Sequence, residues 1–200
     1  VKVQLGRRLF YDPRLSGNQT QSCSSCHEQE RAFTDGKKTS TGSTGHVLAR
    51  NAQGLQNAAY NSTLTWANNG LTALEDQLEV PIRNDRPVEL GVNDGNVGEV
   101  LKRFSDDAEY AQQFEAAFPE SSSGITVEKI IFALATFCRA LVSADSPYDR
   151  YLAGDAAALD VGFRVARLRS APARPEDEDA MSFAASASRR SASNIARPAG

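Results

Sequence analysis

The sequence predicts a mainly α-helical domain over residues 1–158, followed by a tail over residues 159–200 that we expect to be disordered. Two observations lead to this prediction. Apolar residues recur with helical spacing near the N-terminus and over most of residues 97–152. Between these parts, residues 11–70 are rich in Gly, Asn, Ser and Thr, which favour turns and loops. We therefore expect helices that hold long irregular loops.

The first helix is predicted over residues 2–10, with three apolar residues on its inner face: Leu5, Leu9 and Phe10. Asp12-Pro13 should end it, because the residue before a proline is driven out of the helical region. Gly17-Asn18 predicts a turn. A polar loop follows to about Gly45, and the asparagine-rich residues 46–70 predict loops and short turns.

The later helices are predicted over residues 71–80, 97–104, 107–118, 127–142 and 148–152. Pro81 should end the first of these, because proline cannot continue a helical hydrogen-bond ladder. Thr126 is a suitable N-cap for the longest, which carries one apolar stripe. Cys138 belongs to that stripe, and we interpret it as a small buried hydrophobe.

The composition changes near residue 160. Residues 161–200 consist mainly of Ala, Ser, Arg and Pro and carry seven arginines against four acidic residues. Few large apolar residues occur there, which predicts a disordered or weakly ordered tail. The whole chain has a net charge of −3, and we expect no nucleic-acid partner. No apolar run approaches the roughly 18 residues of a membrane-spanning helix, so no membrane span is predicted.

The stretch Cys23-Ser24-Ser25-Cys26-His27 reads C-x-x-C-H, the attachment signal of c-type haem. Two cysteines three positions apart, at the opening of a helix, can each form a thioether with one vinyl group of the same porphyrin. His27 can then give an imidazole nitrogen to the iron as proximal ligand. The motif predicts one covalently bound haem c, around which we expect the loops of residues 46–70 to wrap.

Two other interpretations of the motif are weaker. Zinc needs four ligands, and only Cys138 and His46 remain elsewhere as soft ligands. A thioredoxin-like redox motif needs a preceding strand and a βαβ context, which the pattern does not indicate. With three cysteines and two used by haem, no disulfide framework is expected.

The haem motif also predicts a compartment. In bacteria, c-type haem is attached outside the cytoplasmic membrane, so a periplasmic location is expected. The chain begins at Val1 without a signal peptide, and we interpret it as a mature form or a fragment.

Several stretches together resemble the bacterial di-haem cytochrome c peroxidases, the MauG-type family. They are residues 5–16 (LGRRLFYDPRLS), Arg50-Asn51, residues 57–61 (NAAYN), Trp66 with Gly70, Leu74 and Gln77, then Pro81, Glu89-Leu90-Gly91 and residues 133–155. The resemblance covers residues 1 to about 158. It implies the family's N-terminal domain, with a cytochrome c-like fold and a peroxidatic haem.

The resemblance implies a function and a set of roles. The substrate would be hydrogen peroxide, and the electrons would come from a cytochrome or another small redox donor. Glu89 matches the glutamate that moves a proton between the two peroxide oxygens, and Gln77 matches a neighbouring glutamine. Trp66 matches a tryptophan that relays electrons between two haems. Asn51 matches a side-chain ligand of an interdomain calcium ion.

Each of these residues also has a plainer interpretation. Glu89 precedes a glycine and could be a solvated turn residue. Trp66 is the only tryptophan and could serve packing alone, and Asn51 could hold a loop. His46 is a loop histidine in a region where some family members place a removable iron ligand, although the local spacing differs.

The sequence departs from the family in one large respect. A second domain with its own C-x-x-C-H motif is absent, and residues 159–200 contain no cysteine or histidine. We suspect a truncated or frame-shifted sequence. Two alternatives to a peroxidase stay open: an inactive haem-binding fragment, and a mono-haem electron-transfer cytochrome. The latter usually offers a methionine ligand, but the only one here is Met181 in the tail. A homodimer is also left open.

Overall fold

The structure is a computed structural model that describes residues 1–155 and 157–159. Within these residues it contains helices, short 3₁₀ turns and isolated β-bridges, and no named strand. The prediction of a mainly α-helical domain is confirmed. The α-helices of the described residues are α1 (Lys2–Tyr11), α2 (Leu74–Arg83), α3 (Val97–Ser105), α4 (Ala108–Ala117), α5 (Val127–Arg139) and α6 (Pro147–Leu152).

The chain divides into two compact units, and the boundary follows Ser143. The first unit contains α1 to α5 and all the loops between them. In the second unit, α6 begins after a capping box in which Ser146 and Asp149 exchange hydrogen bonds. The predicted tail, residues 159–200, lies outside the described residues except for Leu159. The predicted domain boundary at residue 158 therefore stays a prediction.

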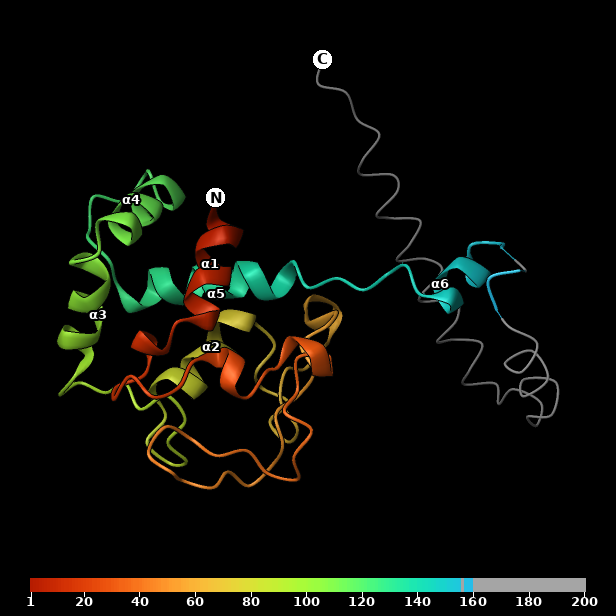
Figure 1. Ribbon diagram of the computed structural model, residues 1–200, viewed down its shortest axis with the longest axis horizontal. Helices are drawn as coiled ribbons and strands as arrows, with labels where there is room; N and C mark the ends of the chain where they lie inside the picture. Colours follow the sequence, from red (N-terminus) through yellow and green to blue (C-terminus); the bar gives the residue numbers. More distant parts are fainter. Residues whose placement is uncertain (156, 160–200) are drawn as a thin grey trace, which may run out of the picture. The chain divides into compact units, whose positions relative to one another are not determined.

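The core of the first unit forms where α1 packs against α5 (Figure 1). The two helices approach so closely that a Cβ atom on Gly6 would overlap the backbone carbonyl of Ala133. Leu5 and Leu9 on α1 and Leu134 on α5 are fully buried at this crossing. Each such side chain contributes roughly 1.5–3 kcal/mol through removal from water. The predicted inner face of the first helix is confirmed.

Helix α5 begins where the sequence predicts, because the side chain of Thr126 accepts a hydrogen bond from the backbone nitrogen of Lys129. It ends at Arg139, three residues before the predicted end. Beyond it the backbone turns, and the carbonyl of Leu141 accepts a hydrogen bond from the nitrogen of Asn57 across 2.8 Å. A tertiary contact with a distant loop therefore replaces the last turn.

Helix α2 corrects the prediction for Pro81. The expected helix over residues 71–80 begins at Leu74 instead and continues through Pro81 to Arg83. The proline is tolerated because it lies in the last turn, where its missing N–H removes a single helical bond. The carbonyls in the last turn of α2 bond to the loop that follows the helix. Those of Pro81 and Ile82 accept hydrogen bonds from the nitrogens of Leu90 and Val92.

A polar cluster joins the end of α1 to α4. The hydroxyl of Tyr110 donates a hydrogen bond to Asp12 across 2.9 Å, although its ring is fully buried. Arg14 forms ion pairs with Asp12 at 2.7 Å and with Asp107 at 3.1 Å. Asp107 also caps α4, because its side chain accepts hydrogen bonds from two backbone nitrogens. The cluster fixes α4 beside the first helix.

The loops that precede α2 and the loop between α2 and α3 gather on the side of the α1–α5 pair that carries α2 (Figure 1). A 3₁₀ turn at Ala58–Tyr60 contacts α5, and α2 contacts α5 as well. Among the described residues, no helix has the length and apolar character needed to cross a membrane.

Candidate functional site

A cavity of about 490 Å³ lies between the loops, α2 and α5. Its volume falls within the range of about 300–1,000 Å³ that is typical of small-molecule and cofactor sites. Much of its wall is apolar, with contributions from Phe10, Leu55, Leu64, Leu74, Leu78 and Leu90. All three residues of the haem motif that carry chemistry also line it: Cys23, Cys26 and His27. The cavity is therefore the candidate cofactor site.

The two motif cysteines lie on a single short turn. Cys23–Ser25 is a 3₁₀ helix that begins at a capping box between Ser22 and Ser25. The motif predicts the opening of an α-helix here, and the structure has only this one turn. The backbone nitrogens of Cys26 and His27 both bond to the carbonyl of Cys23, at 3.2 and 2.9 Å. This compact turn brings all three side chains to one wall of the cavity.

Two backbone carbonyls hold the imidazole of His27. Its Nδ1 atom lies 2.7 Å from the carbonyl oxygen of Phe33 and 3.0 Å from that of Gln53. Because a carbonyl can only accept, Nδ1 carries the proton and donates it, and Nε2 keeps a free lone pair. Burial lowers the pKa of His27, which keeps the ring neutral at neutral pH. The ring is therefore prepared as a metal ligand through Nε2.

The Phe33 carbonyl reaches His27 because the chain turns sharply before it. Ala32 and Phe33 both have left-handed backbone, with φ of 60° and 59°. Such a conformation costs an L-residue roughly 1–2 kcal/mol. It persists here because the turn is closed by bonds from Glu28 to Thr34 and from Phe33 to Glu28. Strained backbone of this kind is often found at functional sites.

The residues of this wall fit a covalently attached haem. Cys23 and Cys26 are both free cysteines, and burial raises the pKa of each thiol, that of Cys23 to about 12. Both are therefore neutral thiols at neutral pH. Two thiols three residues apart, a neutral imidazole with a free Nε2 and a mainly apolar cavity form the donor set that haem c requires.

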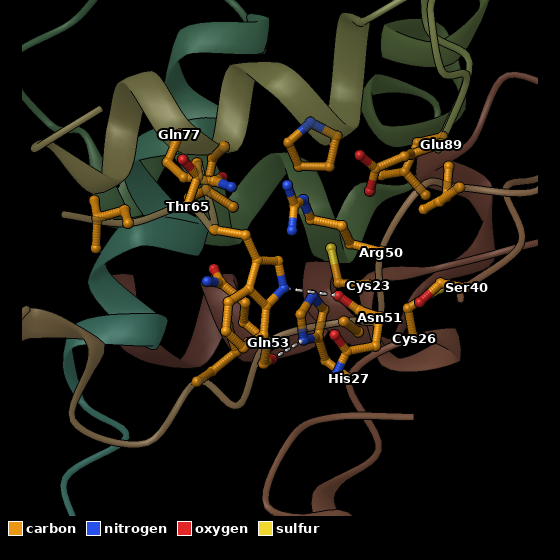
Figure 2. A pocket seen from close by; sticks show the side chains of 18 of the residues that line it. Cys23, Cys26, His27, Ser40, Arg50, Asn51, Gln53, Thr65, Gln77 and Glu89 are labelled. Carbon is orange, nitrogen blue, oxygen red and sulfur yellow. Dashed lines mark hydrogen bonds between the residues drawn. The ribbon is translucent and has the colours of Figure 1, made fainter. Parts of the chain in front are cut away.

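Gln77 and Glu89 lie on the side of the cavity opposite His27 (Figure 2). Gln77 comes from α2, whose Leu74 and Leu78 also face the cavity. Glu89 lies in the loop after α2, where its carbonyl accepts a hydrogen bond from the nitrogen of Ser43 across 2.8 Å. The adjacent Leu90 is bonded to Pro81 and to Gly17 through its backbone. The loop that carries Glu89 is thus tied to three other segments.

The carboxyl group of Glu89 has neither a hydrogen bond nor an ion pair within the described residues. Burial raises its pKa above the usual value of a glutamate, because the charged form loses hydration without gaining a partner. The raised pKa moves its titration toward neutral pH, where a carboxyl group can both accept and donate a proton.

Trp66 lines the cavity and is also 54% exposed at the surface. Its indole Nε1 donates a hydrogen bond to the backbone carbonyl of Asn51 across 3.1 Å (Figure 2). The ring therefore lies between the cavity and solvent. The role expected for Trp66 in electron relay stays a prediction.

The structure brings Asn51 to the cavity but leaves His46 outside its lining. His46 is exposed, in a loop closed by the bridge between Thr41 and Val47. Ligation of iron by His46 would require this loop to move inward, and it stays a prediction. The described residues contain no group of three or more His, Cys, Asp or Glu side chains that could hold a metal. Calcium ligation by Asn51 likewise stays a prediction.

Three features of the site were not found from the sequence. The residue types of Phe33 and Gln53 do not reveal that their carbonyls bond to His27, because every residue carries a backbone carbonyl. Arg50 extends into the cavity (Figure 2), although the sequence indicates it only as part of the Arg50-Asn51 pair that resembles the family. Cys138 is 3% exposed, which confirms the prediction of burial, and it also lines the cavity.

Comparisons with known proteins agree with this geometry. Residues 1–157 match the family model described as di-haem cytochrome c peroxidase. Cytochrome c peroxidase Ccp of Escherichia coli (strain K12) is 37% identical over 158 residues, which is 79% of this chain and 32% of that protein. Methylamine utilization protein MauG of Methylorubrum extorquens is 35% identical over 158 residues, 79% of this chain and 43% of that protein.

A solved structure resembles the chain as well. It is the crystal structure of a MauG-like protein associated with microbial copper homeostasis, with a TM-score of 0.76 and 52% sequence identity. The match covers 77% of this chain and 44% of that one. The chain thus spans less than half the length of these relatives.

Proposed function

The chain belongs to the di-haem cytochrome c peroxidase family, and from this premise we propose that it carries one covalently attached haem c and acts in the reduction of hydrogen peroxide to water. The electrons would come from a cytochrome or another small redox protein. Since the chain covers 32–44% of the relatives above, this activity is proposed for the chain as the peroxide-reactive domain. A periplasmic location follows from the site of c-type haem attachment in bacteria.

The observation that carries the proposal is the arrangement of His27 and Glu89 on opposite sides of one cavity (Figure 2). A haem held there would supply an iron that binds peroxide and accepts electrons. The wall with Cys23, Cys26 and His27 would hold it. The opposite wall, with Gln77 and Glu89, would then be the side that binds the substrate.

Glu89 is the residue proposed to move the proton. Its carboxyl group has no competing partner among the described residues and an elevated pKa, so it can take a proton from one peroxide oxygen and return it to the other. The amide of Gln77, on the same side, can donate a hydrogen bond to the substrate or accept one from it. The apolar residues around them limit water, which strengthens both interactions.

Trp66 is proposed as the electron entry point. Its ring contacts both the cavity and the outer surface, and the hydrogen bond to Asn51 fixes its orientation. An electron donor or a second haem domain that docks over this surface would meet the indole directly. The exposed face of the tryptophan supports this role.

The proposal is tested first by the attachment of haem. The chain is produced with a c-type maturation system, denatured, and extracted with acid and acetone. We expect the haem to stay with the polypeptide in the wild type and in Cys138→Ser, which alters a cavity thiol outside the motif. We expect it to be extracted from the double variant Cys23→Ser, Cys26→Ser. Complete extraction from the wild type would contradict covalent attachment.

The second part of the test measures reactivity. The ferric absorption spectrum of the loaded protein is recorded with and without hydrogen peroxide. A rapid spectral change supports a peroxide-reactive haem. A spectrum that stays unchanged in peroxide would instead favour an electron-transfer cytochrome or an inactive haem-binding domain.

A further inference from the structure

The cavity holds one cationic side chain among the described residues that line it, that of Arg50. The only carboxylate in the same lining is that of Glu89. Burial alone raises the pKa of Glu89, with no contribution from a nearby arginine. Arg50 and Glu89 therefore do not form an ion pair, and the positive charge of Arg50 is available to another group.

No hydrogen bond, ion pair or ring contact within the described residues uses the guanidinium of Arg50. Other arginines of the described chain do have partners, for example Arg139 with Glu75 and Arg103 with Glu99. An arginine offers five N–H donors in a planar fork that matches a carboxylate. Arg50 is an exposed residue, and its fork extends into a largely apolar cavity without an acceptor from the described part of the chain (Figure 2).

The group expected in this cavity brings two carboxylates of its own, since haem carries two propionates. A carboxylate at the edge of an apolar cavity is costly unless a charged donor pairs with it. We infer that the guanidinium of Arg50 binds a propionate of the haem and so offsets its negative charge near the iron. This inference rests on the proposed function only in requiring haem in the cavity.

The position of Arg50 in the chain makes this contact consequential. The backbone carbonyl of its neighbour Asn51 accepts a hydrogen bond from Trp66. The carbonyl of Gln53, three residues after Arg50, accepts one from His27. A propionate bound by Arg50 would therefore anchor a loop that also touches the proximal histidine and the exposed tryptophan. Arg50 is thus assigned as a positioning residue that acts on the haem from its edge.

The test compares Arg50→Gln with Arg50→Lys in the haem-loaded protein. Loss of a positive charge beside the haem favours the ferric iron. In a redox buffer of fixed potential, we expect the ratio of ferrous to ferric haem in Arg50→Gln to be about tenfold lower than in the wild type. A tenfold change in this ratio corresponds to a shift of about 59 mV in the potential of a one-electron couple. Arg50→Lys keeps the positive charge, so its ratio of ferrous to ferric haem should stay within about twofold of the wild-type ratio. Arg7→Gln, an exposed residue outside the cavity lining, is the matched control for net charge and should match the wild type.

A vibrational measurement separates propionate contact from a distant charge effect. The propionate bending bands in the resonance Raman spectrum should shift in Arg50→Gln and stay unchanged in Arg7→Gln. If the reduced fraction and the bands of Arg50→Gln both equal those of the wild type, the inference is wrong. A changed reduced fraction with unchanged bands also overturns the direct contact.

A measurement on the wild type covers the case in which Arg50→Gln does not load haem. Phenylglyoxal modifies accessible arginines, and peptide mass spectrometry resolves each site. In the loaded protein, Arg50 should react at least about tenfold more slowly than Arg7. Equal rates would overturn the inference. Because the acid and acetone extraction establishes haem attachment independently, a failure of the Arg50 assignment is distinguishable from a failure of the proposed function.

Discussion

The indole nitrogen of Trp66 donates a hydrogen bond across 3.1 Å to the backbone carbonyl of Asn51, fifteen residues earlier in the chain. This bond holds an exposed aromatic ring against the loop whose next residues reach His27. Two residues beyond Asn51, the carbonyl of Gln53 accepts a hydrogen bond from the imidazole of His27 at 3.0 Å. The surface ring and His27 are therefore joined through three residues of one loop.

This arrangement predicts that Trp66 is needed for repeated turnover and not for the first reaction with peroxide. We expect Trp66→Phe to react once with hydrogen peroxide at the wild-type rate. Adding a C-terminal haem domain from a complete relative should increase steady-state oxidation of a reduced cytochrome by the wild-type chain. Trp66→Phe should abolish that gain, because it removes the indole and its bond to Asn51. The readout is the absorbance of the reduced cytochrome.

The matched control for Trp66 is Tyr60→Phe, which alters another exposed aromatic residue of the same loop region. Tyr60→Phe should keep the full increase in cytochrome oxidation that the added haem domain causes. Fast oxidation of the cytochrome by the isolated chain would show that electrons enter by a different path.

Glu89→Gln should slow the reaction with peroxide by roughly 10²–10⁴-fold, because a proton acceptor is replaced by a neutral amide of similar volume. Stopped-flow absorbance measures the rate. Glu115→Gln, an exposed substitution on α4, should leave it unchanged. A Glu89→Gln rate within twofold of the wild type would remove Glu89 from the mechanism.

The elevated pKa of Glu89 also predicts the pH profile of this reaction. The base must be ionised to accept a proton, so the rate should fall as the pH drops through the pKa of Glu89. Since burial raises that pKa, the fall should begin at a higher pH than the usual value of 4.5 for a glutamate would give. The acid limb should be missing in Glu89→Gln.

Tyr110→Phe should lower the free energy of unfolding by about 1.5–3 kcal/mol, the range for a hydrogen bond to a charged group. It removes the buried hydroxyl that donates to Asp12. Burial raises the pKa of Asp12, but the hydrogen bonds from Arg14 and Tyr110 outweigh burial and lower it overall. The stabilisation is therefore present above the unfolded pKa of Asp12 and is lost as the pH falls through the folded value.

Urea unfolding at neutral pH and in acid measures both effects. The difference between Tyr110→Phe and wild type should shrink in acid, where Asp12 is protonated. Tyr11→Phe removes an exposed hydrogen bond to Gln29, so it should lower the free energy of unfolding by less than Tyr110→Phe does. Equal costs for the two tyrosine substitutions would contradict the importance of the Asp12 cluster.

Gly6→Ala should destabilise the protein by about 1–3 kcal/mol or more, the typical cost of overpacking a core. The added Cβ would overlap the carbonyl of Ala133 where α1 crosses α5. Gly98→Ala is the matched control, because it lies in α3 with open space around its Cα. It should stabilise by roughly 0.5–1 kcal/mol, since glycine is unfavourable within a helix. A neutral Gly6→Ala would mean that the two helices can separate at no cost.

Periodicity was enough to predict most helices and their buried faces. Leu5 and Leu9 recur at the spacing of one helix face, and Thr126 is a residue that caps helices well. The ends of helices were less predictable, because tertiary contacts decide them. Pro81 is tolerated since the helix ends soon after it and its carbonyl bonds to Leu90, and α5 stops early where Leu141 binds Asn57. No local pattern contains those partners.

The sequence by itself determined the identity of the cofactor chemistry, because covalent haem attachment needs two cysteines and a histidine at a short fixed spacing. Tertiary structure alone decided what surrounds that motif. It placed the carbonyls of Phe33 and Gln53 on His27, left the half-buried Glu89 without a carboxyl partner among the described residues, and turned Arg50 into the cavity. These properties depend on burial and on contacts between distant segments. They arise only when the loops close around one cavity, which no single stretch of sequence encodes.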